Sequence, residues 1–276
     1  MFNYIIYHKS CSDGFASAYI AWKVNGDNST YIPLSYHDKL PDIKNSNLLI
    51  CDFSFDFNIT NNYIKNNNVF FNIDHHKSAF DNLKDLPQKY KYFDNDHSGA
   101  YLTWKYFFNE LEVPRFIKLI EDYDLWKFKY KETKPFIIAL NEIPFNFKIW
   151  QKLEDETYLN DLINKGKVLL SYQENIVNII YKNAKIKSQK IGENYYNIAY
   201  VNTNCFKNEV ADKLMLETDC DFSVVYNYDD SKDITKFSLR SIDSKTDVSH
   251  ICKIIGGGGH RNSAGYCKPG FHNSLI

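Results

Sequence analysis

The segment VFFNIDHHK, residues 69–77, decides how the first half of this chain folds. Residues 69–73 are largely apolar and predict a short buried strand. The strand runs directly into Asp74, His75 and His76. A carboxylate followed by two adjacent imidazoles is hard to explain as an ordinary strand end. We therefore interpret the segment as a strand that carries chemical groups at its carboxyl end.

Two earlier strand candidates end in the same way. Residues 3–7 lead into His8, with Asp13 shortly after, and residues 47–51 lead into Asp52. Helical periodicity separates the strands, and such alternation predicts an α/β fold with a parallel, doubly wound sheet. The carboxyl ends of parallel strands share one edge, where ligands bind. We therefore expect these polar side chains to meet the Asp-His-His triplet.

Imidazoles and carboxylates that converge in this way suit a divalent cation with nitrogen and oxygen ligands, such as Mn²⁺, Mg²⁺ or Co²⁺. The pattern disfavours a zinc–thiolate site. Each residue also has a simpler interpretation when it is taken alone. His8 fits a solvated strand end, Asp52 fits a turn, and Asp13 fits a helix cap.

The second half of the chain has a different texture. Residues 154–188 show long helical periodicity without proline, which predicts a connecting helix. Strand and helix patterns alternate again after it, which predicts a smaller α/β domain. The expected organisation is a catalytic domain, a connecting helix and a substrate-binding domain, at residues 1–153, 154–188 and 189–276.

A glycine run marks the second domain. Residues 256–259 are four glycines, followed by His260 and Arg261. Such a run can turn backbone N–H groups toward an anion, although a flexible linker has the same composition. Only three of the 33 basic residues are arginines, and Arg240 lies on a predicted strand just upstream. The expected substrate-binding residues are Arg240, Gly257, Gly258, Gly259, His260 and Arg261.

Composition limits the function classes. The 276 residues are 44% hydrophobic and 24% charged, with a net charge of −1, which is typical of a globular protein and unfavourable for binding long duplexes. No apolar run approaches the ~20 residues of a membrane helix, and no secretory signal is visible. The six cysteines form no CxxC pair. We expect a cytoplasmic protein with reduced thiols and no membrane contact.

Taken in order, these motifs resemble those of the DHH phosphoesterase family across nearly the whole chain. The Asp-His-His triplet matches the motif that names the family, and residues 256–265 match the GGGGH-x-x-A-x-G signature of its associated C-terminal domain. The other matching segments are His8 with Asp13 and Gly14, Cys51 with Asp52, Ser238 to Ser241, and residues 121–126.

The resemblance implies hydrolysis that depends on one or two Mn²⁺ ions, with Mg²⁺ or Co²⁺ as alternatives. His76 would lie near the phosphate or the metal-bound water, and Asp74 belongs to the same catalytic motif. Asp122 is expected as a ligand in preference to Asp124. The implied metal ligands are His8, Asp13, Asp52, His75 and Asp122.

One position departs from the family pattern. Many members carry a second aspartate two residues after the first, and here that position is Phe15. A carboxylate ligand is therefore missing, and the number of bound metal ions is open.

The resemblance also implies a small substrate: a short single-stranded oligonucleotide, a linear dinucleotide or adenosine 3′,5′-bisphosphate. A single-strand-specific exonuclease and a catalytically weakened nucleotide sensor are the alternatives. The oligomeric state is open.

Overall fold

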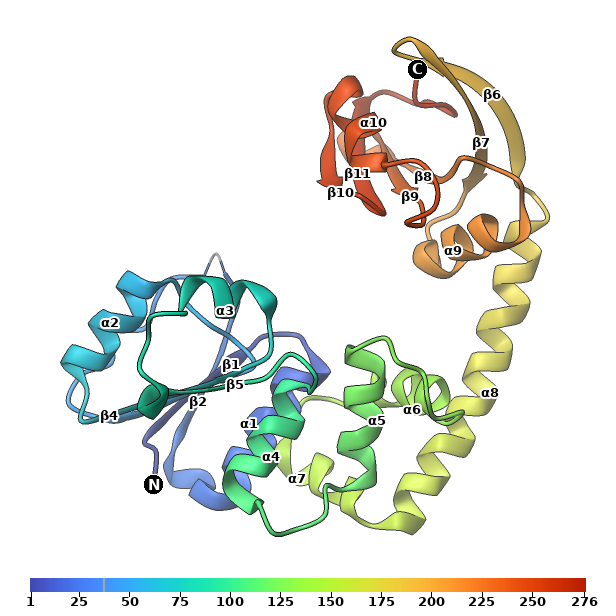
Figure 1. The fold of residues 1–276 in the computed structure, drawn as a ribbon. Helices are drawn as coiled ribbons and strands as arrows, with labels where there is room; N and C mark the ends of the chain where they lie inside the picture. Colours follow the sequence, from blue (N-terminus) through green and yellow to red (C-terminus); the bar gives the residue numbers. More distant parts are fainter. Residues whose placement is uncertain (37) are drawn as a thin grey trace. The chain divides into compact units, whose positions relative to one another are not determined.

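The computed structural model describes residues 1–36 and 38–276, which form two compact units, Met1–Leu170 and Ser171–Ile276 (Figure 1). The long helix α8 (Glu156–Tyr181) runs from the first unit into the second. The connecting helix expected over residues 154–188 is thus shorter than predicted. Strand β6 (Lys185–Ile191) takes up its last residues, because a tight turn at Gly192 pairs that segment with the next strand.

A five-stranded sheet organises the first unit, and all of its strands are parallel. The strand order is β2-β1-β3-β4-β5, which confirms the predicted doubly wound sheet. From β1 the chain adds β2 on one side of the sheet and β3 on the other, so the strand order reverses between β1 and β3. Folds of this kind bind ligands at that point. The strands are β1 (Tyr4–His8), β2 (Thr30–Leu34), β3 (Asn47–Cys51), β4 (Val69–Asp74) and β5 (Lys91–Phe93).

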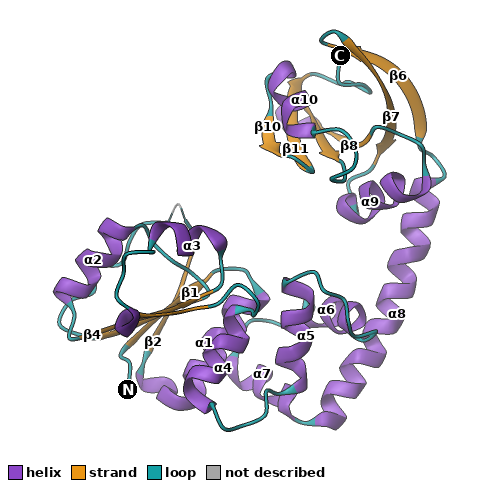
Figure 2. Ribbon diagram, in the orientation of Figure 1, coloured by secondary structure: helices purple, strands orange, loops and turns teal. Residues whose placement is uncertain are grey.

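Helices cover both faces of this sheet, which explains why its central strands are almost wholly apolar. Helix α2 (Phe57–Asn66) packs on one face, where Tyr63 meets Ile6 and Ile50. Helices α1 (Ser12–Asn25) and α4 (Gly99–Phe108) pack on the other, where Leu102 meets Ile5 (Figure 2). Successive strand residues therefore enter different cores.

The other helices of the unit include one beside the sheet and several that extend the α1 side. Their core contains the buried aromatic residues Phe116, Phe136 and Trp150. These helices are α3 (Lys77–Asn82), α5 (Arg115–Asp124), α6 (Thr133–Leu140) and α7 (Phe147–Trp150).

The second unit contains a six-stranded mixed sheet of order β10-β11-β9-β8-β7-β6. Only the β7–β8 pair is parallel among its described pairs. Helix α9 (Lys207–Glu217) packs on one face and α10 (Val248–Ile255) on the other. The remaining strands are β7 (Asn194–Asn202), β8 (Phe222–Asp229), β9 (Ile234–Arg240), β10 (Gly258–His260) and β11 (Ser263–Pro269).

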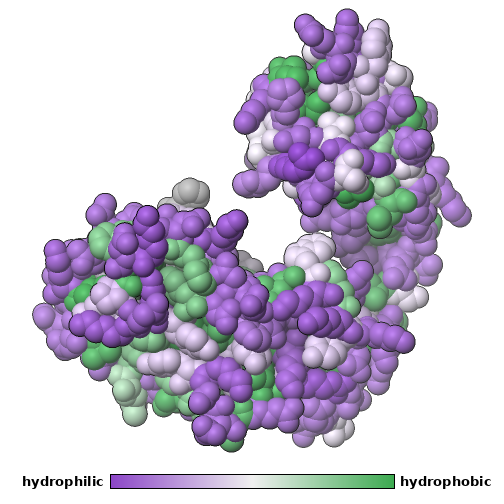
Figure 3. All heavy atoms as spheres, in the orientation of Figure 1, coloured by the Kyte–Doolittle hydropathy of each residue, from purple (hydrophilic) through white to green (hydrophobic). Residues whose placement is uncertain are grey.

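The surface is mainly polar. Hydrophilic residues cover most of the drawn face of each unit, and hydrophobic residues show as smaller areas between them (Figure 3). Among the described residues, no helix combines the length and the apolar character needed to span a membrane.

Helix α8 approaches α6 so closely that only glycine fits at the contact. A Cβ atom at Gly166 would overlap the Pro135 carbonyl oxygen. Gly→Ala in a helix ordinarily stabilises by about 1 kcal/mol. We expect Gly166→Ala to lower the free energy of unfolding by about 1–3 kcal/mol, the usual cost of overpacking. Gly258→Ala is the control, since a Cβ there meets open space. A more stable Gly166→Ala protein in denaturant titration would contradict this packing.

Candidate metal centre

Three neighbouring strands deliver polar side chains to one edge of the first sheet. His8 ends β1, Asp52 directly follows β3, and Asp74 ends β4. Asp13 joins them from the first turn of α1. These side chains therefore meet at one edge of the sheet, as the sequence predicts. The edge lies where the strand order reverses.

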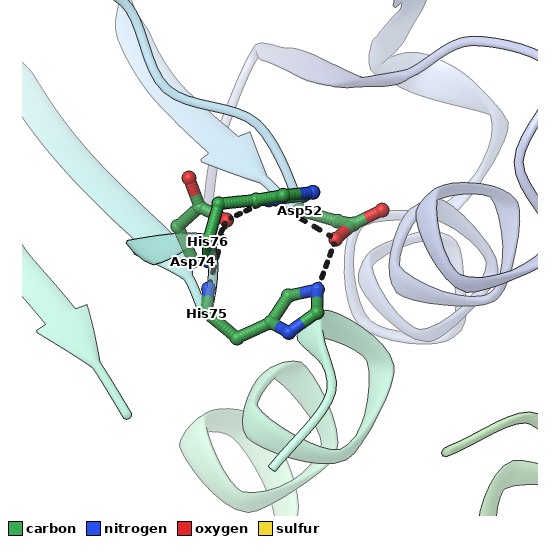
Figure 4. A group of neighbouring side chains, drawn as sticks. All are labelled: Asp52, Asp74, His75 and His76. Atoms are coloured by element: carbon green, nitrogen blue, oxygen red, sulfur yellow. Dashed lines mark hydrogen bonds and ion pairs between the residues drawn. The ribbon is translucent and has the colours of Figure 1, made fainter. Parts of the chain in front are cut away.

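Asp52 lies at the centre of the site. Its side chain is 1% exposed, and its φ of 52° places the backbone in the left-handed region, which non-glycine residues rarely adopt. His75 Nε2 lies 3.1 Å from Asp52 Oδ1, and His8 Nδ1 lies 3.7 Å from Oδ2 (Figure 4 shows the His75 pair). Burial opposes the charge of Asp52, but the imidazoles of His75 and His8 outweigh it and lower the Asp52 pKa to about 2.

His75 and His8 lie within ion-pair distance of Asp52, but no described group makes a hydrogen bond of good geometry to either Asp52 carboxylate oxygen, and the same holds for His8 Nδ1. Buried polar atoms are nearly always hydrogen-bonded, because an unpaired one costs about 1–3 kcal/mol. Three such atoms in one place indicate that the site is completed by something else. A bound cation is the group that fits carboxylate oxygens and an imidazole nitrogen.

A second group of donors adjoins Asp52. One oxygen each of Asp13 and Asp124 lies with a ring nitrogen of His75 inside a 4.8 Å cluster. His75 Nε2 is 3.7 Å from Asp13 Oδ2 and 3.4 Å from Asp124 Oδ2. Burial would lower the His75 pKa, but Asp52, Asp13 and Asp124 raise it to about 9. Burial and the Asp52 charge raise the Asp13 pKa well above its usual range. A dication would relieve this concentration of negative charge.

Two glycines allow the backbone to come this close. The Gly99 and Ala100 N–H groups donate to the Asp13 carboxylate at 2.7 and 3.0 Å, which fixes the carboxylate at the start of α4. A Cβ at Gly99 would lie 2.6 Å from the Asp52 Cβ, and one at Gly14 would overlap the His8 carbonyl oxygen. Both positions therefore require glycine if the site is to form.

Asp74 and His76 form a separate pair beside Asp52. His76 Nδ1 lies 2.7 Å from Asp74 Oδ1, and that oxygen also accepts the backbone N–H groups of His75 and His76 (Figure 4). The Ser54 hydroxyl donates to the other oxygen at 2.5 Å. Both oxygens of Asp74 are thus engaged, and one of them holds the His76 ring in place. The hydrogen bond to Asp74 raises the His76 pKa.

The structure places Asp122 differently from the expectation. Asp122 accepts hydrogen bonds from the backbone N–H groups of Lys129 and Tyr130 and from the Thr133 hydroxyl, at 2.8, 3.2 and 2.5 Å. Its carboxylate therefore holds the loop after α5. Asp124 is the residue that reaches His75, so we correct the candidate ligand from Asp122 to Asp124. Two residues along a helix differ by about 200° in direction, which separates the two carboxylates.

Phe15 occupies the position at which a carboxylate ligand is missing, and its side chain does not face the site. Its ring is 3% exposed and stacks between Phe145 and Phe147, with centroids at 4.8 and 5.0 Å. Trp150 contacts the same ring edge-on. Position 15 is therefore part of the hydrophobic core, and an aspartate there would be buried among aromatic rings.

The second unit brings some of the expected substrate-binding residues together. His260 of β10 is paired with Ser263 of β11, which is paired in turn with Arg240 of β9. Residues in register across a sheet share a face, so Arg240 and His260 project from the same side. Arg240 also donates to Asn208 Oδ1 at 2.5 Å.

The glycine run forms the end of a helix and a short edge strand. Gly256, at φ 89°, ends α10, and Gly258–His260 forms the edge strand β10. A Cβ at Gly257 or Gly259 would overlap the neighbouring strand β11, so close strand packing explains these two glycines. Arg261 binds the Asp243 carbonyl oxygen at 2.8 Å, within its own unit.

The two aspartates of α5 can be separated by substitution. We expect Asp122→Ala to lower the free energy of unfolding by at least about 2 kcal/mol, because three hydrogen bonds to a buried carboxylate are lost. Its Mn²⁺ affinity should persist. Asp124→Ala should keep the fold and lose the rise in melting temperature that Mn²⁺ gives. Thermal unfolding with and without Mn²⁺ measures both effects. Loss of the Mn²⁺ response in Asp122→Ala alone would restore Asp122 as the ligand.

Solved structures were compared with the fold just described. The pGpG-specific phosphodiesterase PggH of Vibrio cholerae matches 98% of this chain and 94% of its own, with a TM-score of 0.62 at 13% identity. At this identity the likeness concerns the fold, which the two proteins share across both units.

The chain is also similar in sequence to a viral protein. No protein-family model matches the chain. The uncharacterized protein R106 of Acanthamoeba polyphaga mimivirus is 35% identical over 98% of this chain and 68% of its own length. Identity of this degree over nearly the whole chain shows common descent, and this chain belongs to the same family as R106.

Proposed function

We propose that this chain is a metal-dependent phosphodiesterase of the DHH type that hydrolyses short oligonucleotides or small nucleotides. The observation that carries the proposal is the buried Asp52 carboxylate, whose oxygens lack a hydrogen bond among the described residues while His8, His75, Asp13 and Asp124 surround it. The fold shared with a pGpG-specific phosphodiesterase supports the same chemistry. Mn²⁺ is the cation we propose, because this set of oxygen and nitrogen donors suits it.

Different residues of the chain would bind the cations and position the proton donor. Asp13, Asp124 and His75 would hold a cation on one side of Asp52, and His8 would hold one on the other. Such a cation supplies Lewis acidity toward a phosphate ester and its attacking water. Asp74 keeps His76 oriented through Nδ1 and its hydrogen bond raises the His76 pKa, which favours His76 as the group that would protonate the leaving oxygen.

An aromatic surface beside Asp124 favours a nucleotide as the substrate. Trp126, two residues later, is 71% exposed and has a left-handed backbone with φ 52°. Its ring stacks at 23° on Tyr123 and meets Phe128 edge-on. Exposed, oriented aromatic rings are the usual platforms for single-stranded bases. We propose that Trp126 stacks on a base next to the scissile phosphate.

Sequence reasoning included Trp126 only as part of a motif. Its signal was present as a large aromatic residue two positions after Asp124.

In the second unit, we propose that Arg240 and His260 contact the substrate phosphate from their shared face of the sheet. Arg240 offers a planar fork of donors that suits a phosphate group.

The test is product analysis with Mn²⁺ on a series of short RNAs, short DNAs, linear and cyclic dinucleotides, adenosine 3′,5′-bisphosphate and polyphosphate. We expect cleavage of short oligonucleotides or linear dinucleotides, and its loss in Asp52→Asn. Asp42→Asn, at an exposed residue paired with Lys44, is the matched control and should keep full activity. Binding of these compounds without any Mn²⁺-dependent cleavage would favour a nucleotide sensor and would refute the enzyme.

The stacking role of Trp126 has its own test. Base stacking on an aromatic side chain is worth about 1–3 kcal/mol. Trp126→Ala should therefore raise KM for a short oligonucleotide about 5- to 150-fold, with kcat and Mn²⁺ affinity unchanged. Trp126→Phe should recover part of the loss, and Tyr195→Ala, at a tyrosine that is 72% exposed in the second unit, should have no effect. An unchanged KM in Trp126→Ala would remove this residue from the substrate site.

A further inference from the structure

A sulfur atom lies among the unpartnered groups of the metal centre. One ring nitrogen of His8, the Cys11 thiol and one oxygen of Asp52 are all within 4.8 Å of one another. This cluster is distinct from the one formed by Asp13, His75 and Asp124, and it lies on the His8 side of Asp52.

One member of this cluster is buried, and two of its members carry buried atoms without a hydrogen bond. Asp52 is 1% exposed and neither of its oxygens has a hydrogen bond among the described residues, and the Nδ1 atom of the partly exposed His8 is buried and likewise lacks one. A lone thiol would carry no weight by itself. Here it completes a three-donor set, imidazole, thiol and carboxylate, whose other donors are unsatisfied.

We propose that Cys11 supplies a sulfur ligand to a cation position that it forms with His8 and Asp52, and that this position takes a thiophilic divalent ion such as Zn²⁺ or Co²⁺. This inference rests on the proposed metal-dependent function and assigns one ligand within it. It reverses the expectation that cysteine plays no part in the site.

The start of α1 explains why the ligand is at position 11. The helix begins at Ser12, and Cys11 has an extended backbone with φ −118° and ψ 135°, so its side chain leaves the chain before the helical turn. Cys11 precedes Asp13 by two residues, whereas Phe15 follows it by two and lies in the core. A thiolate at position 11 supplies the negative charge that position 15 lacks.

The ligand set decides the metal preference. Thiolate sulfur and imidazole favour Zn²⁺ and Co²⁺, whereas Mg²⁺ prefers oxygen. The thiol proton would pass to solvent as the sulfur binds a dication, because a metal-bound thiol is deprotonated.

The experiment is a titration of the metal-free full chain with Co²⁺, followed by absorption spectroscopy and by equilibrium dialysis. Cobalt bound to a thiolate gives a sulfur-to-metal charge-transfer band in the near ultraviolet. We expect this band in the wild-type protein and its loss in Cys11→Ser. Serine is a preferred N-cap residue, so α1 should keep its start. Cys205→Ser, at an exposed free cysteine in the second unit, is the matched control and should keep the band.

Affinity provides an independent readout. Loss of an outer-shell partner costs about 10- to 100-fold in metal affinity, so loss of a direct ligand should weaken Zn²⁺ binding at least about tenfold. Cys11→Asp should lose the band and shift the preference from Zn²⁺ toward Mn²⁺. Bound Co²⁺ without the band, or a band that persists in Cys11→Ser, would overturn the sulfur ligand while leaving the metal centre intact. Absence of any bound Co²⁺ would refute both the ligand and the proposed metal centre.

Discussion

The first unit is built around one unfavourable feature, a buried aspartate that faces two imidazoles and whose oxygens make no hydrogen bond with the described residues. Asp52 combines burial, a left-handed backbone and two unsatisfied oxygens. Each of these features costs folding free energy, and they persist together only where the surrounding structure enforces them. Such strain is typical of functional sites.

The surrounding structure enforces this geometry through backbone contacts. The Asp52 N–H donates to the Ile73 carbonyl oxygen at 2.9 Å, so strand β4 fixes the residue that follows β3. Gly14 and Gly99 let the starts of α1 and α4 approach the same point. Packing of the sheet against the apolar cores on its two faces offsets the free-energy cost of the site. The chemistry therefore depends on a rigid edge between β1 and β3 rather than on a mobile loop.

The two units have separate cores and carry different kinds of residues. The first holds the clustered carboxylates and imidazoles, and the second holds Arg240 and His260 in one row across its sheet. This distribution suits a division between cation binding and phosphate binding. It also gives the sulfur of Cys11 a consequence for metal choice, because one soft ligand is enough to change the preference of a site that is otherwise made of oxygen and nitrogen donors.

The sequence by itself determined the strands that carry the site. Their apolar runs end in charged residues, and this local pattern needs no tertiary information to be read. The local pattern does not reveal β2, because Pro33 lies within that strand. Proline is tolerated there because β2 is at the edge of the sheet. The glycine run likewise has two local interpretations, and pairing with β11 selects the strand.

Only the tertiary structure decided which of two nearby residues faces the site. Asp122 and Asp124 are two positions apart on a helix, as are Asp13 and Phe15 on another. Residues with that spacing point in nearly opposite directions. Motif spacing cannot choose between them, because the choice depends on how each helix is rotated against the sheet. Packing sets that rotation: Phe15 enters the aromatic core, Asp122 binds the loop after α5, and Asp13 and Asp124 join His75 in the candidate metal cluster.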